Sequence, residues 1–274
     1  MIRVLQSVSC AGAKTNEDLI WYDGETILLL DGATSLIPTA LDGSWFVHSF
    51  AEAFRGHPGE RLDQRVNHAL AEVTDLYRQQ QSEDDPKYYP SAGGVIAQLR
   101  GSTLEILAVG DCTGLVFLRS GELLTLTDEA IRALDQQVFD LCKTLHETTG
   151  RTNAELMRSE EVRAALLKNR QKMNRPDGYR ILSMETSPFT EDDVTRIPAD
   201  AVRRIVCFSD GFDALAEELR QPELSLAALY TQLRHMEADD PDFEQYPRFK
   251  PGDDASALVA ELDAPNRAQT QSAE

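Results

Sequence analysis

The order of strand-like and helix-like segments is the feature that most constrains the fold of this chain. Four apolar runs with strand character follow one another between residues 93 and 128, and short segments containing Gly or Ser join them. Connections this tight join antiparallel neighbours, because two parallel strands need a long crossover between them. Helical patterns come in pairs between blocks of strands, without regular strand–helix alternation. We therefore expect an α+β domain in which helices cover antiparallel sheets.

The residue patterns also locate the individual elements. Strands are predicted at 2–9, 18–23, 26–31, 93–100, 103–110, 113–120, 122–128, 178–185, 203–209 and 255–262. Apolar residues at three- and four-residue steps predict helices at 44–54, 62–81, 155–173, 212–219 and 224–237, and another that starts near 128. No linker divides the chain, so residues 1–262 are expected to form one domain with a helical flap or insertion at about 129–175. Residues 263–274 are small and polar, which predicts a disordered tail.

The composition of the 274 residues narrows the possible partners. The formal charge of −19 disfavours nucleic acid and anionic membrane surfaces as binding partners. No apolar run is long enough to cross a membrane, and the N-terminus lacks the continuous apolar segment of a signal peptide. The cysteines are scattered without metal-type spacing, which predicts reduced thiols and a cytoplasmic protein: Cys10, Cys112, Cys142 and Cys207.

Acidic residues recur at the ends of the apolar strands. ILLLDG ends on Asp31, LAVGD on Asp111 and CFSDG on Asp210, while Asp253 and Asp254 precede the last strand. A single aspartate at such a place is usually a turn residue. Several at the strand ends of one core repel one another and lose solvation, so they indicate a site for cations. Oxygen ligands alone select hard cations such as Mg2+, Mn2+ or Ca2+.

Other acidic and basic segments leave alternatives open. Glu17 and Asp18 precede the second strand, either as an exposed turn or as further ligands of the same site. The acidic stretch 235–245 is either a solvated loop or the rim of the site. None of the five histidines has ligand spacing to another, and no phosphate-binding loop or nucleophile-elbow motif is present.

The order of the short motifs NED, LLLDGAT, a GG-containing strand, AVGDCTG, GYRILS, CFSDG and GDDASAL resembles that of the metal-dependent protein phosphatases of type 2C, bacterial branch. The similarity runs from about residue 5 to residue 261. It implies a four-layer α-β-β-α sandwich, in which two antiparallel sheets are flanked by helix pairs. It also implies a two-metal centre at one end of the sandwich, occupied by Mn2+ or Mg2+.

The resemblance assigns roles to the acidic positions. Asp31 would bridge the two metals, with Asp210 and Asp253 completing one site and Glu17 and the carbonyl of Gly32 the other. These three aspartates would be the catalytic groups. Asp111 would hold a third, weaker metal together with Asp210. Asp254 stands where the family often has Asn, so Asp253 is the better candidate for a ligand, and Asp18 and Asp254 are secondary candidates.

One departure from the family concerns phosphate binding. The family usually has an Arg four residues before the acidic ligand, where this chain has Ala13. Lys14 and Arg248 are the two candidates to replace it, although Arg and Lys bind phosphate with different geometry.

The resemblance implies a cytoplasmic, monomeric protein serine/threonine phosphatase that acts on phosphorylated proteins, opposite a cognate kinase. In this family a metal-bridging hydroxide attacks phosphorus in line. Two other functions stay open. The loss of the Arg favours a phosphatase-like regulatory binding module, whereas the retained acidic positions disfavour it. A phosphatase of a small phosphorylated metabolite would need a short flap and a deep pocket.

Overall fold

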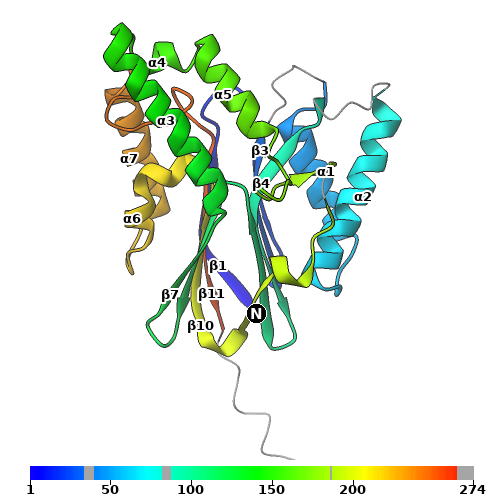
Figure 1. The fold of residues 1–274 in the computed structure, drawn as a ribbon. Helices are drawn as coiled ribbons and strands as arrows, with labels where there is room; N and C mark the ends of the chain where they lie inside the picture. Colours follow the sequence, from blue (N-terminus) through cyan, green and yellow to red (C-terminus); the bar gives the residue numbers. More distant parts are fainter. Residues whose placement is uncertain (34–39, 82–87, 186, 264–274) are drawn as a thin grey trace, which may run out of the picture.

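The computed structural model describes residues 1–33, 40–81, 88–185 and 187–263. Two antiparallel sheets face each other (Figure 1). The first has the strand order β1 (Ile2–Cys10), β11 (Ala255–Leu262), β10 (Val202–Phe208), β6 (Thr113–Leu118) and β7 (Leu123–Leu126). The second has the order β2 (Asp18–Tyr22), β3 (Thr26–Ala33), β4 (Ser91–Arg100), β5 (Thr103–Val109) and β9 (Thr195–Pro198), and the short β8 (Leu182–Ser183) pairs with β4.

Helices cover the outer face of each sheet. The pair α1 (Gly43–Arg55) and α2 (Leu62–Gln80) packs on the second sheet, and α6 (Ala216–Leu219) and α7 (Leu226–Asp239) pack on the first (Figure 1). A third group lies at one end of the sandwich: α3 (Glu129–Thr149), α4 (Asn153–Leu156) and α5 (Glu160–Arg170). The predicted four-layer α-β-β-α sandwich is confirmed.

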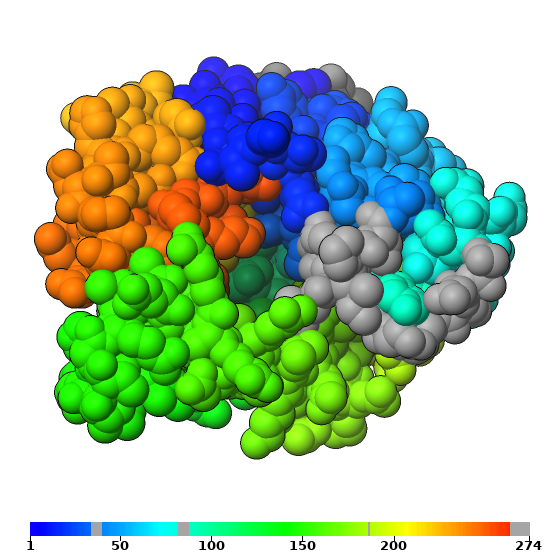
Figure 2. Space-filling view, turned by 90° about the horizontal axis from the view of Figure 1, so that it is seen from above, coloured from blue at the N-terminus to red at the C-terminus, as the bar shows by residue number. Residues whose placement is uncertain are grey.

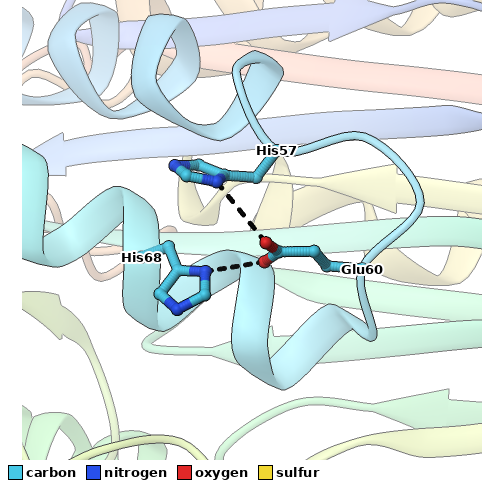
Figure 3. Close-up of side chains that lie close together, drawn as sticks. All are labelled: His57, Glu60 and His68. Carbon is cyan, nitrogen blue, oxygen red and sulfur yellow. Dashed lines mark hydrogen bonds and ion pairs between the residues drawn. The ribbon is translucent and has the colours of Figure 1, made fainter.

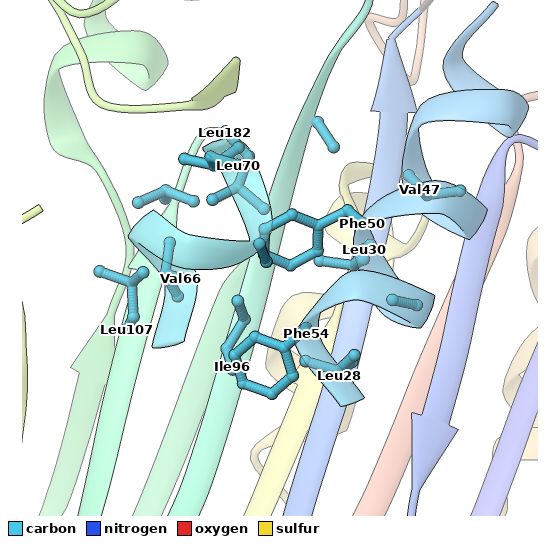
Figure 4. Packing of buried hydrophobic residues seen from close by; sticks show 14 of the residues in the cluster. Leu28, Leu30, Val47, Phe50, Phe54, Val66, Leu70, Ile96, Leu107 and Leu182 are labelled. Atoms are coloured by element: carbon cyan, nitrogen blue, oxygen red, sulfur yellow. The ribbon is translucent and has the colours of Figure 1, made fainter. Parts of the chain in front are cut away.

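Strand β3 contains an apolar run that has no polar face. Leu28 and Leu30 pack against the helices with Phe50 and Phe54 (Figure 4), whereas Ile27 and Leu29 point into the space between the sheets. Successive side chains of a strand point to opposite faces. Both faces of this strand are covered, so every position of the run is apolar and buried.

Three short 3-10 segments complete the description: Glu191–Asp193, Ala199–Ala201 and Asp210–Leu215. Among the described residues, no helix is both long enough and apolar enough to span a membrane. Of the predicted tail, residues 264–274 lie outside the described part of the chain.

The connection between β5 and β6 differs from the prediction. The sequence predicted successive hairpins, yet β5 pairs with β4 and β9 in one sheet while β6 pairs with β7 and β10 in the other. The chain therefore changes sheets at Gly110 and Asp111. Two further predictions were inaccurate: the expected strand at 178–185 shrinks to β8, and the expected helix at 155–173 is divided into α4 and α5 by Ser159, which caps α5.

The acidic stretch 235–245 is anchored rather than solvated at its centre. Asp240 is 4% exposed and accepts hydrogen bonds from the backbone N–H groups of Glu244, Gln245 and Tyr246. These bonds and an ion pair with Arg248 lower the pKa of Asp240 against the opposing effect of burial. The solvated-loop reading was therefore wrong for this residue.

The ordered segment that follows supports the helices at the end of the sandwich. Phe249 stacks on Phe139 of α3 with ring centroids 4.8 Å apart. Asn153 and Ala154 of α4 donate hydrogen bonds to the carbonyl groups of Phe243 and Asp242. The predicted helical segment is thereby tied to the chain just before β11.

We expect Phe50→Ala to lower the free energy of unfolding by about 3–5 kcal/mol, because it leaves a cavity in the layer between α1 and the second sheet. Urea denaturation measures this change. Leu76→Ala on α2 is the control, since Leu76 is 38% exposed and its truncation should cost under about 1 kcal/mol. Equal losses for the two variants would contradict the assignment of the core.

Candidate metal centre

Carboxylates from both sheets converge at the end of the sandwich where β2 begins and β10 ends. Asp18, the first residue of β2, lies opposite Asp31 of β3. Asp210 follows β10 in the other sheet, and its charge is one of the causes that raise the pKa of Asp31. Asp253 precedes β11 and lines the same cavity as Asp210 and Asp111. The strand-end aspartates singled out in the sequence are thus brought together.

The carboxylates in this cluster resist ionisation. Burial, followed by the charges of Asp18, Asp210 and Asp111, raises the pKa of Asp31 well above its usual range. Burial, followed by Asp253 and Asp111, does the same to the pKa of Asp210. Burial is also the largest cause that raises the pKa of Asp111 to about 6. A bound cation would reverse these shifts, because an opposite charge nearby favours the ionised carboxylate.

Two glycines make room for Asp111 at the point where the chain changes sheets. Gly110 adopts a positive φ of 67°, a conformation that costs glycine little. A Cβ atom on Gly93 would lie 2.7 Å from Oδ1 of Asp111, so a side chain there would push this carboxylate out of its position. Gly93 is also the β4 partner of Asp31. The GG-containing strand of the sequence thus gives space to a carboxylate of the cluster.

Asp254 organises the loop that carries Glu17. Its Oδ1 accepts a hydrogen bond of 2.8 Å from the backbone N–H of Gly12, and its Oδ2 accepts one of 2.7 Å from that of Glu17. Both oxygens therefore hold backbone groups, and the structure makes Asp254 a positioning residue for the loop.

Gly32 joins that loop to β3. Its N–H donates to the carbonyl of Glu17 over 3.1 Å. A Cβ atom on Gly32 would lie 2.6 Å from the same carbonyl oxygen and 2.8 Å from the backbone of Gly43, so a side chain would force the segments apart. This close approach places Glu17 next to the strand that carries Asp31.

The donor atoms of the cluster fit hard divalent cations. Asp18 accepts a hydrogen bond from Ser209 at Oδ2, whereas its buried Oδ1 has no hydrogen-bond partner among the described residues. A buried oxygen without a hydrogen-bond partner is stabilised when it binds a cation, a proton or a water molecule. Cys112 lies beside Asp31 and Asp111, but burial and then the carboxylates raise the pKa of its thiol well above the usual range. The neutral thiol is a poor ligand, which leaves an oxygen-only set.

The structure changes the assessment of the two phosphate-binding candidates. Arg248 donates all five of its N–H groups within its own segment. One goes to the carboxylate of Asp240, and the other four go to backbone carbonyl groups, those of Glu237, Asp240, Tyr246 and Pro251. It therefore holds the segment before β11 and has no N–H left for a phosphate. Lys14 is exposed on the loop before β2.

Lys250 is the basic residue that sequence reasoning missed. Its Nζ lies 2.7 Å from Oδ1 of Asp253, and its side chain is 59% exposed. Burial lowers its pKa, but the charges of Asp253, Asp210 and Asp31 raise it more, so the pKa lies above the ordinary value. The available signal was its position three residues before Asp253 in the sequence KPGD.

A cavity of about 260 Å³ opens beside the carboxylates. Figure 2 shows the hollow at the centre of this face, between α3, the segment before β11 and the N-terminal loop. Its lining includes the carboxylates of Asp111, Asp210 and Asp253 and the aromatic rings of Phe139 and Phe249. The segment that contains the acidic stretch therefore also forms part of the rim of the site.

Two residues of α3 that the sequence did not single out face this cavity. Arg132 pairs with Asp213 at 3.2 Å and donates to Thr113 over 2.7 Å. Asp135 also lines the cavity, and burial followed by the charges of Asp111 and Asp213 raises its pKa to about 7. Their helical spacing resembles that of any surface helix, so no sequence pattern marks them as residues of a site.

Comparisons with known proteins agree with this geometry. A family model described as protein phosphatase 2C matches residues 16–246. No curated protein matches the chain in sequence. The fold is similar to that of the serine/threonine phosphatase PstP/Ppp of Mycobacterium tuberculosis, with a TM-score of 0.56, 19% identity and coverage of 96% of this chain and 99% of that chain.

Two further solved structures share the fold. The catalytic domain of the serine/threonine protein phosphatase PstP, in complex with two manganese ions, has a TM-score of 0.54 and 18% identity, with 96% of this chain and 100% of that chain covered. The serine/threonine phosphatase Stp1 from Staphylococcus aureus has a TM-score of 0.52 and 15% identity, with 94% of each chain covered.

We expect the metal-free protein to lose stability as the pH rises. Burial raises the pKa of Asp18 from 3.8 to about 6, so folding favours the protonated carboxyl. The stabilisation is present below about pH 4 and is lost as the pH rises through about 6, by about 3 kcal/mol at most. Urea denaturation with a chelator at about pH 4 and about pH 7.5 measures it.

Asp18→Asn removes the ionisable group and should make the metal-free protein less sensitive to pH over this interval. The exposed Asp192→Asn is the control and should retain the wild-type pH dependence. The attribution to Asp18 is refuted if both variants follow the wild-type curve.

Proposed function

The chain belongs to the protein phosphatase 2C family, and from this membership we propose that it removes phosphate from phosphoserine and phosphothreonine in proteins with the help of divalent cations. The observation that carries the proposal is the meeting of Asp31, Asp210 and Asp253 from two sheets, beside a cavity open to solvent. A domain that only binds a partner gains nothing from burying repelling carboxylates.

The donor set supports two sites for Mn2+ or Mg2+. Asp31, Asp210 and Asp253 would hold one ion, and Asp31 with Glu17 and the carbonyl of Gly32 the other. Asp111 and Asp210 would hold a third ion more weakly, since Asp111 enters from the turn between the sheets. When bound, two such ions supply a hydroxide nucleophile at neutral pH and offset charge on the phosphoryl oxygens.

The chain's own residues prepare the site for a phosphoryl group. Asp254 fixes the loop of Glu17 through two backbone hydrogen bonds, so this ligand needs little reorganisation. Lys250 lies at the rim beside Asp253 and is exposed enough to turn towards a phosphate oxygen. We propose that Lys250, in place of Arg248, supplies the positive charge that the family's Arg provides elsewhere.

The shape of the cavity and the state of the cysteines bear on the substrate class and on the cellular compartment. We propose a phosphorylated protein as the substrate, because the cavity lies on an open face rather than inside a closed pocket. Three of the four cysteines are buried free thiols, which fits a monomer that works in the reducing cytoplasm opposite a cognate kinase.

The first test is the hydrolysis of p-nitrophenyl phosphate by the purified protein with Mn2+, with Mg2+ and with chelator. We expect turnover that depends on the metal and a fall in kcat/KM of at least about 100-fold for Asp210→Asn, because a group that stabilises the transition state is removed. Asp192→Asn, which alters an exposed carboxylate, should retain activity. The proposal fails if the folded protein shows no turnover with either metal.

The role of Lys250 is tested at saturating Mn2+ with a phosphothreonine peptide. We expect Lys250→Gln to lower kcat/KM by about 10- to 100-fold, since a charge-assisted hydrogen bond contributes about 1.5–3 kcal/mol. Lys14→Gln is the matched comparison and should change kcat/KM by less than about threefold. A large loss for Lys14→Gln with none for Lys250→Gln would return the role to Lys14. Mn2+ titration of each variant separates phosphate binding from metal binding.

A further inference from the structure

A second cluster of potential metal ligands lies at the turn between α1 and α2 (Figure 3). It contains His57 and Glu60 from the turn and His68 from α2. The turn follows the C-terminal end of α1, whereas Gly43 at the other end of this helix contacts Gly32 beside the carboxylates. The 13 residues of α1 separate the two places by about 20 Å at 1.5 Å per residue. The cluster is therefore outside the candidate metal centre.

The side chains of the cluster converge on one point. Nδ1 of His68 lies 2.7 Å from Oε2 of Glu60, and Nδ1 of His57 lies 3.6 Å from Oε1 of the same carboxylate. The two imidazole rings have centroids 5.1 Å apart. One potential ligand atom from each residue falls within 4.8 Å of the others. This spacing suits three ligands around one ion at metal–ligand distances of about 2 Å.

Glu72 sets the orientation of the His57 ring. Its Oε1 lies 2.7 Å from Nε2 of His57, and because a carboxylate only accepts, this ring nitrogen carries the N–H that it donates. In the neutral ring the lone pair is then on Nδ1, which faces Oε1 of Glu60 across 3.6 Å, too far for a hydrogen bond. A carboxylate that holds the outer nitrogen of a histidine in this way is the usual partner of a metal-ligating imidazole.

The backbone holds this arrangement without a metal. The carbonyl of Glu60 accepts a 2.7 Å hydrogen bond from the side chain of Gln98, which is buried in β4. Gly59 has a φ of 83°, which lets the turn bring His57 over α2. His68 and Glu72 are one helical turn apart on the same face. The side chains of His57 and Glu60 are 24% and 32% exposed, so an ion can reach them from solvent.

We propose that His57, Glu60 and His68 bind a transition-metal ion of the Zn2+ class, with Glu72 as the residue that positions His57 and water as the fourth ligand. Two imidazole nitrogens and one carboxylate suit Zn2+ better than Mg2+ or Mn2+, which prefer oxygen ligands. The ion would link the turn to α2. The alternative occupant of the gap is a proton, in which case the cluster consists only of ion pairs between histidinium and glutamate.

Calorimetric titration of the full chain with Zn2+ in excess Mg2+ tests the proposal, because the excess Mg2+ would compete with Zn2+ for the proposed oxygen-only centre. The wild-type protein should show a binding event that His57→Ala and His68→Ala both lose. Glu72→Gln should weaken this event by about 10- to 100-fold, as is typical for a residue that orients a metal ligand. His48→Ala, at an exposed position of α1 outside the cluster, is the control and should bind as the wild type does.

Co2+ provides a second readout, since tetrahedral coordination by nitrogen and oxygen gives visible absorption bands that octahedral oxygen coordination gives only weakly. These bands should disappear in His68→Ala, whose side chain is 55% exposed and whose replacement leaves the core intact. The absence of Zn2+ binding in the wild-type protein would overturn the proposal and leave only the ion pairs. Binding that both histidine variants retain in full would also overturn it.

Discussion

The crowding of carboxyl groups at one end of the sandwich is the constraint on which the rest of the structure depends. Asp31 and Asp210 come from different sheets, and burial followed by neighbouring carboxylates raises the pKa of both, so protonation of this cluster is favoured when no cation is present. Ionised together, these groups would repel in a place with little water. A positive charge at this end of the sandwich would therefore stabilise the ionised carboxylates. Lys250 supplies one such charge through its ion pair with Asp253.

The clusters of potential metal ligands near the two ends of α1 contain different donor atoms. Gly43 at the start of α1 supports an oxygen-only cluster, whereas His57 beyond its end faces Glu60 and adds imidazole nitrogen. Hard cations favour oxygen ligands whereas Zn2+ favours nitrogen, so the two proposed sites differ in the ions that they would select. The apolar layer between α1 and the second sheet keeps the two ends at a fixed separation.

The sequence predicted what depends on local pattern and missed what depends on distant partners. Strand β3 was predictable because its apolar run is bounded by Asp31. The change of sheets at Asp111 was not, since a turn sequence shows that the chain reverses but not which sheet receives the next strand. Strand β9 was missed because it has four residues and ends in a proline. Arg248 was a reasonable phosphate-binding candidate until the structure placed it against the buried Asp240, a partner that no spacing rule identifies.

The pairing of β1 with β11 bears on when the protein gains its activity during synthesis. Ile2 lies opposite Leu262, and Glu17 is held by Asp254, 237 residues away in the sequence. Strand β1 therefore cannot pair with β11 until nearly all of the described chain has been synthesised. Pairing between strands so far apart in the sequence is slow. A nascent chain has neither Asp253 nor an ordered Glu17 loop. The enzyme would thus stay inert towards phosphorylated neighbours until its own translation has passed β11.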